Sequence, residues 1–293
     1  MPRLDPEVDT AAVEAGLDAL DAPPDQERRP GLGRRLAWAV LPPIGFLVLV
    51  IAVWQALWAS AIWTEYELPA PLAVWNELVA QFSTGAAFGI IWTSVYRAVI
   101  GFLVAIVIAT PLGLLVAKVR VVRAGIGPFL SGLQSLPSVA WVPAAILWFG
   151  LSDATIYFVV LMGAVPSIAN GLVAGIDQIP PILPRVGKVM GAGRLASSWH
   201  ILLPAAMPGY LAGLKQGWAF SWRSLMAAEL IATSPVLGKG LGAYLDDGRT
   251  QSSMPTVIAA IFLILLVGVG IELLVFRPLE RTVLRARGLS GAA

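Results

Sequence analysis

The chain has 293 residues, of which 57% are hydrophobic and only 13% are charged. A soluble domain is about one quarter charged, so this composition excludes a disordered chain, a nucleic-acid-binding domain and most soluble enzymes. The absence of cysteine and the single histidine, His200, exclude disulfides, iron–sulfur clusters, thiolate zinc sites and histidine-based metal sites. The net charge is +2, but the charges are unevenly distributed along the chain.

The N-terminal segment 1–33 differs from the rest of the chain. Its first 27 residues contain eight acidic side chains and one basic side chain, Arg3. Such a segment cannot bury enough apolar surface to offset the entropy lost on ordering, so we predict an acidic, disordered cytoplasmic tail. It is not a signal peptide, because signal peptides begin with basic residues. Residues 288–293 are expected to form a short C-terminal tail.

Six stretches are long and apolar enough to cross a bilayer core, which needs about 20 apolar residues per helix. They are residues 36–60, 91–117, 127–149, 154–176, 205–233 and 256–276. Pro111, Pro137, Pro143 and Pro166 lie in or near these stretches, where proline kinks a helix or begins one. We therefore predict an all-α, polytopic membrane protein with about six transmembrane helices. The first helix is assigned to residues 34–63 and a core containing the others to residues 64–287.

Lysine and arginine residues fix the predicted orientation. Fifteen of the twenty lie in the N-terminal flank, in 118–123, in 177–204 or in the C-terminal flank, whereas the alternating loops hold only Lys239 and Arg249. Basic residues accumulate on the cytoplasmic side of membrane proteins. We therefore expect the chain to lie in the inner or plasma membrane, with both termini in the cytoplasm. The loop 61–86 has no basic residue and is expected on the outer side.

The long cytoplasmic connection around 182–204 has a pattern of its own. Val186, Val189 and Met190 fall on one helical face, Gly191 permits a sharp turn, and a second short helix precedes Pro204. An apolar, partly basic helical hairpin of this kind either docks on a partner protein or lies on the membrane surface. The sequence pattern alone leaves both interpretations open.

Charged residues inside membrane spans are costly and mark functional or paired positions. Arg97 is interpreted as an anion-attracting group or an interhelical tie, with a snorkelling interfacial arginine as the alternative. Arg223 is the best candidate to meet an anionic substrate, and a salt bridge to Glu229 or Glu272 is the alternative. Trp218 and Ser221 are further candidates, which could line a pore through the membrane together with Arg223.

The remaining intramembrane charges receive structural interpretations. Glu229 is expected to form a structural ion pair near the outer end of its helix, and Lys215 to extend its ammonium group toward the cytoplasm. Glu272 is expected to pair with a neighbouring helix, a proton-coupled role being the alternative. None of these residues indicates a nucleophile, a general base or a metal site, so no catalysis is predicted.

The segment 182–204 resembles the coupling motif of ABC-importer permeases. Gly191 stands at the glycine of that motif and Ile201-Leu202-Leu203-Pro204 at its end, whereas Arg185-Val186-Gly187 replaces the usual Glu-Ala-Ala. The resemblance covers about residues 65–285 and is closest to the nitrate, sulfonate and taurine permeases. The other matching motifs are Leu68-Pro69-Ala70-Pro71, the run from Ser94 to Phe102, Pro111-Leu112-Gly113, Leu136-Pro137, Leu147-Trp148-Phe149-Gly150, Ala228-Glu229 and Gly240-Leu241-Gly242.

The resemblance implies an ABC type I importer-like fold and a transport role without enzymatic activity. Two permease copies would form the translocation pathway for a small anion, and an extracytoplasmic solute-binding protein would deliver it. Two ATPase subunits would hold the ATP, because this chain has no G-x-x-x-x-G-K-[ST] motif. The residues expected to contact the ATPase are Arg185, Val186, Val189, Met190, Gly191, Arg194 and Pro204.

Two other classes of protein compete with the importer hypothesis. A stand-alone secondary transporter or channel would leave the coupling-like loop unexplained and would be expected to show an inverted repeat, which is not evident in the sequence. A membrane scaffold without transport would not need Arg223 and Glu229 inside a span.

Overall fold

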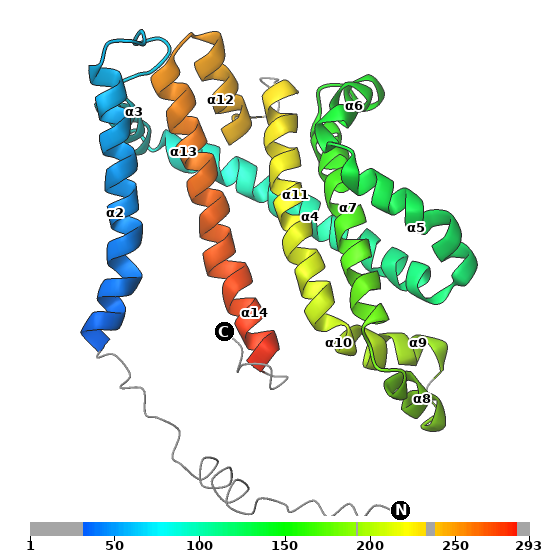
Figure 1. The fold of residues 1–293 in the computed structure, drawn as a ribbon. Coiled ribbons are helices and arrows are strands. Elements are labelled where there is room, and N and C mark those ends of the chain that lie inside the picture. The colour runs from blue at the N-terminus through cyan, green and yellow to red at the C-terminus, as the bar shows by residue number, and fades with distance from the viewer. Residues whose placement is uncertain (1–31, 192, 233–237, 286–293) are drawn as a thin grey trace, which may run out of the picture. The chain divides into compact units, whose positions relative to one another are not determined.

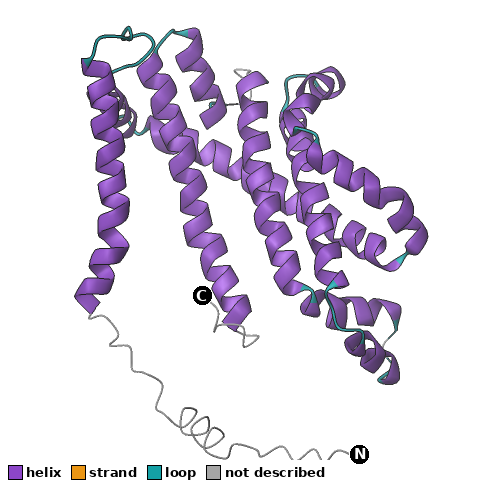
Figure 2. Ribbon diagram, viewed as in Figure 1, coloured by secondary structure: helices purple, strands orange, loops and turns teal. Residues whose placement is uncertain are grey.

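The computed structural model describes residues 32–191, 193–232 and 238–285, and this part of the chain is helical without any strand (Figures 1 and 2). The predicted all-α class is therefore confirmed. The predicted tails at 1–33 and 288–293 lie outside the described residues, apart from Leu32 and Gly33, which begin the first described helix. The structure divides into two units, residues 1–59 and 60–293.

The first unit is described as one long helix, α2 (Leu32–Ala59). From Leu41 to Ala59 it is apolar, and none of this window is buried within the structure. Its large apolar side chains, including Phe46 and Val53, are exposed around the helix. A helix that is apolar on all sides is suited to a hydrocarbon environment, in agreement with the predicted first span.

The second unit contains the long helices that form its apolar core. They are α4 (Ala86–Lys118), α7 (Asp153–Asp177), α11 (Met207–Ile231) and α13 (Met254–Ile271), the last continuing through η4 (Glu272–Phe276) into α14 (Arg277–Arg285). Helices α7 and α11 lie side by side, and α4 runs obliquely across them (Figure 1). Buried side chains from these helices form two apolar clusters, one toward each end of the unit.

Glycine residues allow α7 and α11 to touch through their backbones. Gly171 and Gly175 of α7 face Gly213 and Gly209 of α11, and a Cβ atom added to Gly213 would lie 2.7 Å from the Cα of Gly171. Small residues at four-residue spacing are typical of close helix–helix contacts in membranes. The sequence carries this signal as Gly-x-x-x-Gly at 171–175 and twice in succession at 209–217.

The predicted third span, 127–149, is not a straight helix but a bent pair of helices. The chain instead forms α5 (Arg120–Ser135), a short turn of helix η1 (Ser138–Trp141) and α6 (Val142–Phe149), with a bend of 99° between the two parts. Pro137 has no backbone N–H to donate and restricts Leu136 to an extended conformation, with φ −77° and ψ 126°. The helix therefore ends at Ser135 and resumes in a new direction.

Two connections that were predicted as loops also contain helices. The segment 61–86 includes α3 (Pro71–Ser83), and the connection after α11 includes α12 (Leu241–Thr250). The predicted hairpin is present as α8 (Ile182–Val189) followed by α9 (Arg194–Ser197), η2 (Ser198–Leu202) and α10 (Leu203–Ala205). Gly191 has a φ of +78°, a conformation that side-chain-bearing residues rarely adopt.

Within the described residues, four helices are long and apolar enough to cross a membrane, and the bent pair α5–α6 makes a fifth. Helix α11 corresponds to the predicted span 205–233 and has 25 residues, about 37 Å, which is sufficient length. Its composition is less apolar than that of the other spans, and it is absent from the four. From Ala212 to Ala227 the exposed face of this helix carries small and polar side chains, where the exposed faces of α4 and α13 carry large apolar ones.

Candidate functional site

The hairpin exposes an apolar face at one end of the molecule. Val189 and Met190 have 89% and 81% of their surface exposed, and Ile182 and Val186 on the same short helix are also exposed. Arg185 and Lys188 lie among them and are exposed. Pro204, expected at the same contact, lies beyond the second helical segment in α10 and is exposed, and Arg194 begins α9. The hairpin therefore presents an exposed apolar surface that is flanked by basic side chains.

The opposite side of the hairpin is held against the helical core. Lys118 at the end of α4 donates to the hydroxyl of Ser198 in η2. Arg123 pairs with Asp177 at the end of α7, with Nη1 2.8 Å from Oδ1. Within the hairpin, Gly187 of α8 packs closely against the side chain of Ile201 in η2. The hairpin is therefore attached to the end of α4 through Ser198 and packs on α7 through α10, while its apolar face stays free.

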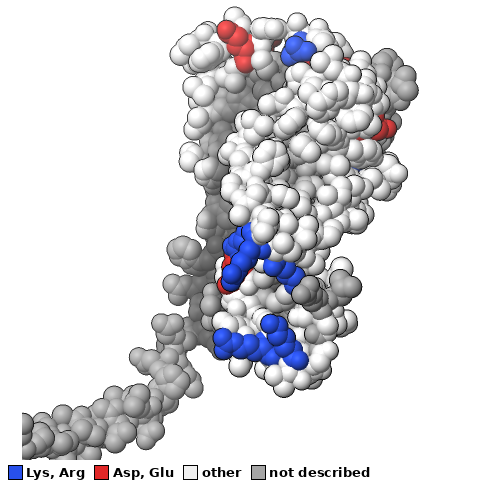
Figure 3. All heavy atoms as spheres, turned by 90° about the vertical axis from the view of Figure 1, so that its right-hand side faces the viewer, with Lys and Arg blue, Asp and Glu red and all other residues white. Residues whose placement is uncertain are grey.

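Basic side chains surround this end of the molecule. Figure 3 shows Lys and Arg gathered over the lower part of one face, which is the hairpin end in Figure 1, whereas the middle of that face is nearly free of charge. The exposed basic residues of the segments that meet here are Lys118, Arg120, Arg123, Arg185 and Lys188. An uncharged band beside a basic end is the surface expected of a membrane protein near its cytoplasmic boundary.

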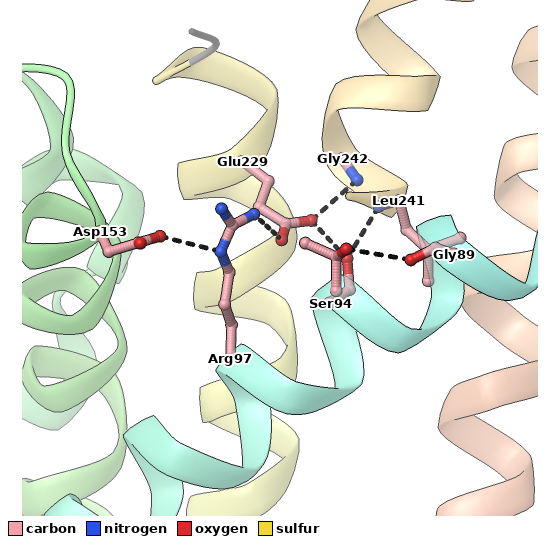
Figure 4. A network of polar contacts seen from close by, with 8 residues as sticks. Gly89, Ser94, Arg97, Asp153, Glu229, Leu241 and Gly242 are labelled. Atoms are coloured by element: carbon pink, nitrogen blue, oxygen red, sulfur yellow. Dashed lines mark hydrogen bonds and ion pairs between the residues drawn. The ribbon is translucent and has the colours of Figure 1, made fainter. Parts of the chain in front are cut away.

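A buried polar cluster lies near the other end of the core, where α4, α7, α11 and α12 meet (Figure 4). Arg97 of α4 bridges two carboxylates: its Nη1 is 3.0 Å from Oε1 of Glu229 on α11, and its Nε is 3.0 Å from Oδ1 of Asp153 on α7. The side chains of Arg97 and Glu229 are 6% and 1% exposed, whereas that of Asp153 is 54% exposed. Arg97 is thus an interhelical tie rather than a snorkelling residue.

The same cluster holds the first turn of α12. The other oxygen of Glu229 accepts hydrogen bonds from Ser94 Oγ at 2.6 Å and from the backbone N–H of Gly242 at 3.1 Å. The N–H of Leu241 donates to Ser94 Oγ at 2.7 Å. Backbone N–H groups at a helix start otherwise lack partners, so side chains from α4 and α11 cap α12.

Sequence motifs that are far apart in the chain therefore meet in one place. The Ser94 to Phe102 run, Ala228-Glu229 and Gly240-Leu241-Gly242 all contribute to this cluster, as Figure 4 shows. A Cβ atom on Gly242 would lie 2.5 Å from the Cβ of Glu229, so the glycine is required for the close approach of α12.

Helix α12 has a further anchor on α3. The hydroxyl of Tyr244 donates to Oε1 of Glu77 at 2.8 Å. Burial raises the pKa of the Tyr244 phenol far above its ordinary value, and the hydrogen bond to Glu77 raises it further. The phenol therefore stays protonated and remains a donor throughout the physiological pH range.

A second group of intramembrane charges joins α11 to η4 and α14. The ammonium group of Lys215 is 2.6 Å from Glu272 and 3.5 Å from Glu280. Lys215, expected to extend its ammonium group toward the cytoplasm, thus pairs with two carboxylates. The three side chains line a pocket of about 340 Å³ on the side of α11. Neither Glu229 nor Glu272 pairs with Arg223, so both salt bridges suggested for that arginine are incorrect.

Arg223 lies in a different environment from the other charged residues of α11. Its side chain is exposed, its Nε donates to the carbonyl of Ala219 at 3.1 Å, and its guanidinium group lies 4.7 Å from the ring centre of Phe220. It lines a pocket of about 330 Å³ beside the break between α5 and η1. Among the four pathway candidates, Arg223 alone lines this pocket.

The other two candidates on α11 are buried. Trp218 packs against Phe102 and Trp222, with ring centres 5.3 and 6.4 Å away, and belongs to the apolar core. The hydroxyl of Ser221 is fully buried and has no hydrogen-bond partner within the described residues. Neither side chain reaches an open pathway in this conformation.

The exposed face of α11 differs from the exposed faces of the neighbouring helices. From Ala212 to Ala227 it presents small and polar side chains, namely Ala212, Gln216, Ala219, Arg223 and the partly buried Ala227. The exposed faces of α4 and α13 carry large apolar side chains such as Trp92, Val107 and Leu265. Large apolar side chains suit lipid, whereas the face of α11 does not, which explains the lower apolarity of this helix.

The fold is that of a multi-pass α-helical membrane protein with an exposed helical hairpin at one end. Residues 109–277, more than half of the chain, match the family described as the inner membrane component of binding-protein-dependent transport systems. The chain belongs to this family, which consists of transport permeases of the inner membrane and not of enzymes.

Individual relatives support the same assignment. A protein of Methanocaldococcus jannaschii named as an ABC transporter permease is 30% identical, over 78% of this chain and 86% of its own length. The taurine transport permease TauC of Escherichia coli is 25% identical, over 82% of this chain and 90% of TauC. The aliphatic sulfonates transport permease SsuC of Bacillus subtilis is 28% identical, over 89% of this chain and 91% of SsuC. The predicted resemblance to this group of ABC permeases is confirmed.

Proposed function

We propose that this chain is the permease subunit of an ATP-driven importer for a small anion of the sulfonate, taurine or nitrate class. The observation that carries the proposal is the exposed apolar face of the hairpin, formed by Ile182, Val186, Val189 and Met190. Apolar side chains that project from a membrane protein at its basic end are suited to a protein partner. We propose that this partner is a separate ATPase subunit, which binds and hydrolyses the ATP.

The way in which the hairpin is attached supports a coupling role. The hairpin connects the end of α7 at Asp177 to the start of α11 at Met207. These two helices are in backbone contact through glycines, and we propose that they move as a pair. A displacement of the hairpin by the ATPase would therefore shift α7 and α11 as one body, together with the pocket that contains Arg223.

The exposed face of α11 supports a pathway between two copies of the chain. In lipid, an exposed arginine and glutamine at mid-helix would be unfavourable, and such residues normally face a water-filled cavity or another subunit. We propose a homodimer in which the α11 faces of both copies, with Gln216 and Arg223, line the translocation pathway. The positive charge of Arg223 supports an anionic solute, as do the names of TauC and SsuC.

We propose the following orientation in the membrane. The basic residues at the hairpin end support a cytoplasmic hairpin and cytoplasmic termini. Helices α3 and α12 would then lie on the outer side, where an extracytoplasmic solute-binding protein delivers its ligand. Membrane lipid would cover the large apolar faces of α2, α4 and α13.

The proposal is tested by weakening the hairpin contact without removing the hairpin. In Val189→Asn and Met190→Asn, the ATPase subunit is expected to co-purify about tenfold less and solute import to fall in parallel, because each change removes apolar area from the contact. Val121→Asn is the matched control, since Val121 on α5 is 82% exposed but lies outside the hairpin. Unchanged ATPase binding in the hairpin variants, or uptake by the purified chain without any ATPase, would favour a stand-alone transporter.

A further inference from the structure

The pocket beside the helix break is built from three parts of the chain. The segment from Leu133 to Val139 supplies the broken end of α5 and the start of η1, Gly163 supplies a surface of α7, and Phe220, Arg223 and Ala227 supply a surface of α11. Its volume of about 330 Å³ is sufficient for a small organic anion. Because its α11 wall is on the exposed face of that helix, the pocket opens onto the pathway of the proposed function.

The geometry of Arg223 leaves its binding atoms available. The Nε bond to the carbonyl of Ala219 and the stacking over Phe220 hold the guanidinium plane in position. Within the described residues, neither terminal nitrogen, Nη1 or Nη2, has a hydrogen-bond or ion-pair partner. A guanidinium group held in this way presents parallel N–H donors that match two oxygens of a planar or tetrahedral oxyanion.

The described residues that line the pocket beside the helix break carry one positive charge and no negative charge. Arg223 is the one charged side chain among the residues that line it, and the rest are apolar or neutral, such as Leu136 and Phe220. The nearby polar side chains are already engaged: Gln134 accepts from Asn170 at 2.9 Å, and Ser138 bonds to Ser224 at 2.6 Å. The carboxylates of Glu229 and Glu272 are bound to Arg97 and Lys215. The pocket therefore offers a single positive charge and, among the residues that line it, no carboxylate to neutralise an ammonium group.

We infer that this pocket is a binding site in the permease itself for a monovalent oxyanion whose tail, if any, is uncharged. The inference rests on the proposed importer function and refines its solute class. A dianion would leave one negative charge uncompensated beside the apolar wall, and a zwitterion would leave its ammonium group without a carboxylate to pair with. The site consequently favours an alkanesulfonate over an aminosulfonate of the same shape, and a monovalent anion over sulfate.

The test uses the full chain together with its ATPase subunits in lipid nanodiscs, without any solute-binding protein. Direct binding is measured for 1-propanesulfonate and for taurine, which have the same number of heavy atoms and differ by a methyl group in place of an ammonium group. Propanesulfonate is expected to bind about tenfold more tightly than taurine and than sulfate, because each of the other two solutes brings one charge that no charged group of the pocket neutralises. This comparison needs no variant of the protein.

Variants then locate the site. Arg223→Gln is expected to weaken propanesulfonate binding about tenfold, because the charge-assisted donors are lost. Arg249→Gln is the matched control, since it removes an arginine charge from α12, away from this pocket, and should leave binding unchanged. Taurine binding as tight as propanesulfonate binding, or full affinity in Arg223→Gln, would overturn the inference.

The same preparations separate this inference from the importer proposal. If the ATPase subunits co-purify and ATP-dependent import is normal but the propanesulfonate preference is absent, only the pocket assignment fails. If the ATPase does not associate at all, the importer proposal fails independently of what the pocket binds.

Discussion

Charged residues in the membrane core of this protein act in different ways that depend on their partners. Arg97 is enclosed by carboxylates from two other helices, whereas Arg223 faces a pocket and has no carboxylate beside it. The sequence identified both arginines as significant but could not distinguish them, because the pairing of Arg97 with Glu229 joins residues 132 positions apart. Contacts of this range depend on how the helices pack.

The Arg97 cluster leads to a prediction at the level of single residues. Glu229→Gln removes the buried charge opposite Arg97 and is expected to destabilise the protein by about 2–3 kcal/mol. Asp153→Asn, the matched control, removes the half-exposed partner of the same arginine and is expected to have an effect of about 1 kcal/mol or less. Thermal unfolding in mild detergent measures both variants, and equal destabilisation would show that burial does not determine the strength of these ion pairs.

At the level of helices, the sequence predicted the positions of the long spans well but missed how some of them are shaped. Apolar runs of 20 or more residues give a strong signal, so α2, α4, α7 and α13 were expected close to where they lie. Pro137 was expected to kink or begin a helix, but the size of the bend was not predictable, because proline also occurs inside intact membrane helices, as Pro111 and Pro166 do here. Helices α3 and α12 are too short and too polar to stand out from loops.

The glycine contact between α7 and α11 gives a prediction at the same level. Gly213→Ala places a methyl group against the backbone of Gly171 and is expected to destabilise the protein by about 1–3 kcal/mol. Gly89→Ala on α4 is the same chemical change where no atom lies within 4 Å, and it should be neutral or stabilising by up to about 1 kcal/mol. Thermal unfolding and ATP-driven import are measured for both. Equal stability in the two variants would mean that the helices separate easily.

For the whole molecule, the division into two units predicts that the core folds without the first helix. Both apolar clusters of the described structure consist of residues from 60–293. Removal of residues 1–59 is therefore expected to change the thermal midpoint of the remaining chain by less than about 4 °C, which corresponds to about 1 kcal/mol for a domain of this size. Fluorescence-detected gel filtration after heating measures the midpoint, and a core that no longer folds would contradict the prediction.

Composition and basic-residue counts predicted the class of molecule, because both reflect the membrane and not a particular contact. The predicted hairpin was also correct in form, since a glycine between two short apolar segments is a local signal. The arrangement of the site was not predictable in this way. It depends on the close approach of α7 and α11 and on the bend before η1, which together bring residues 133–139 next to Arg223.

The modest apolarity of α11 also has a consequence for how the protein is made. A segment that carries Lys215, Gln216 and Arg223 gains little from entering lipid alone when it leaves the ribosome. Helix α7 precedes it by one hairpin and offers a complementary glycine surface. The two segments are therefore best suited to leave the translocation channel as a pair, with α7 retained until α11 has been synthesised.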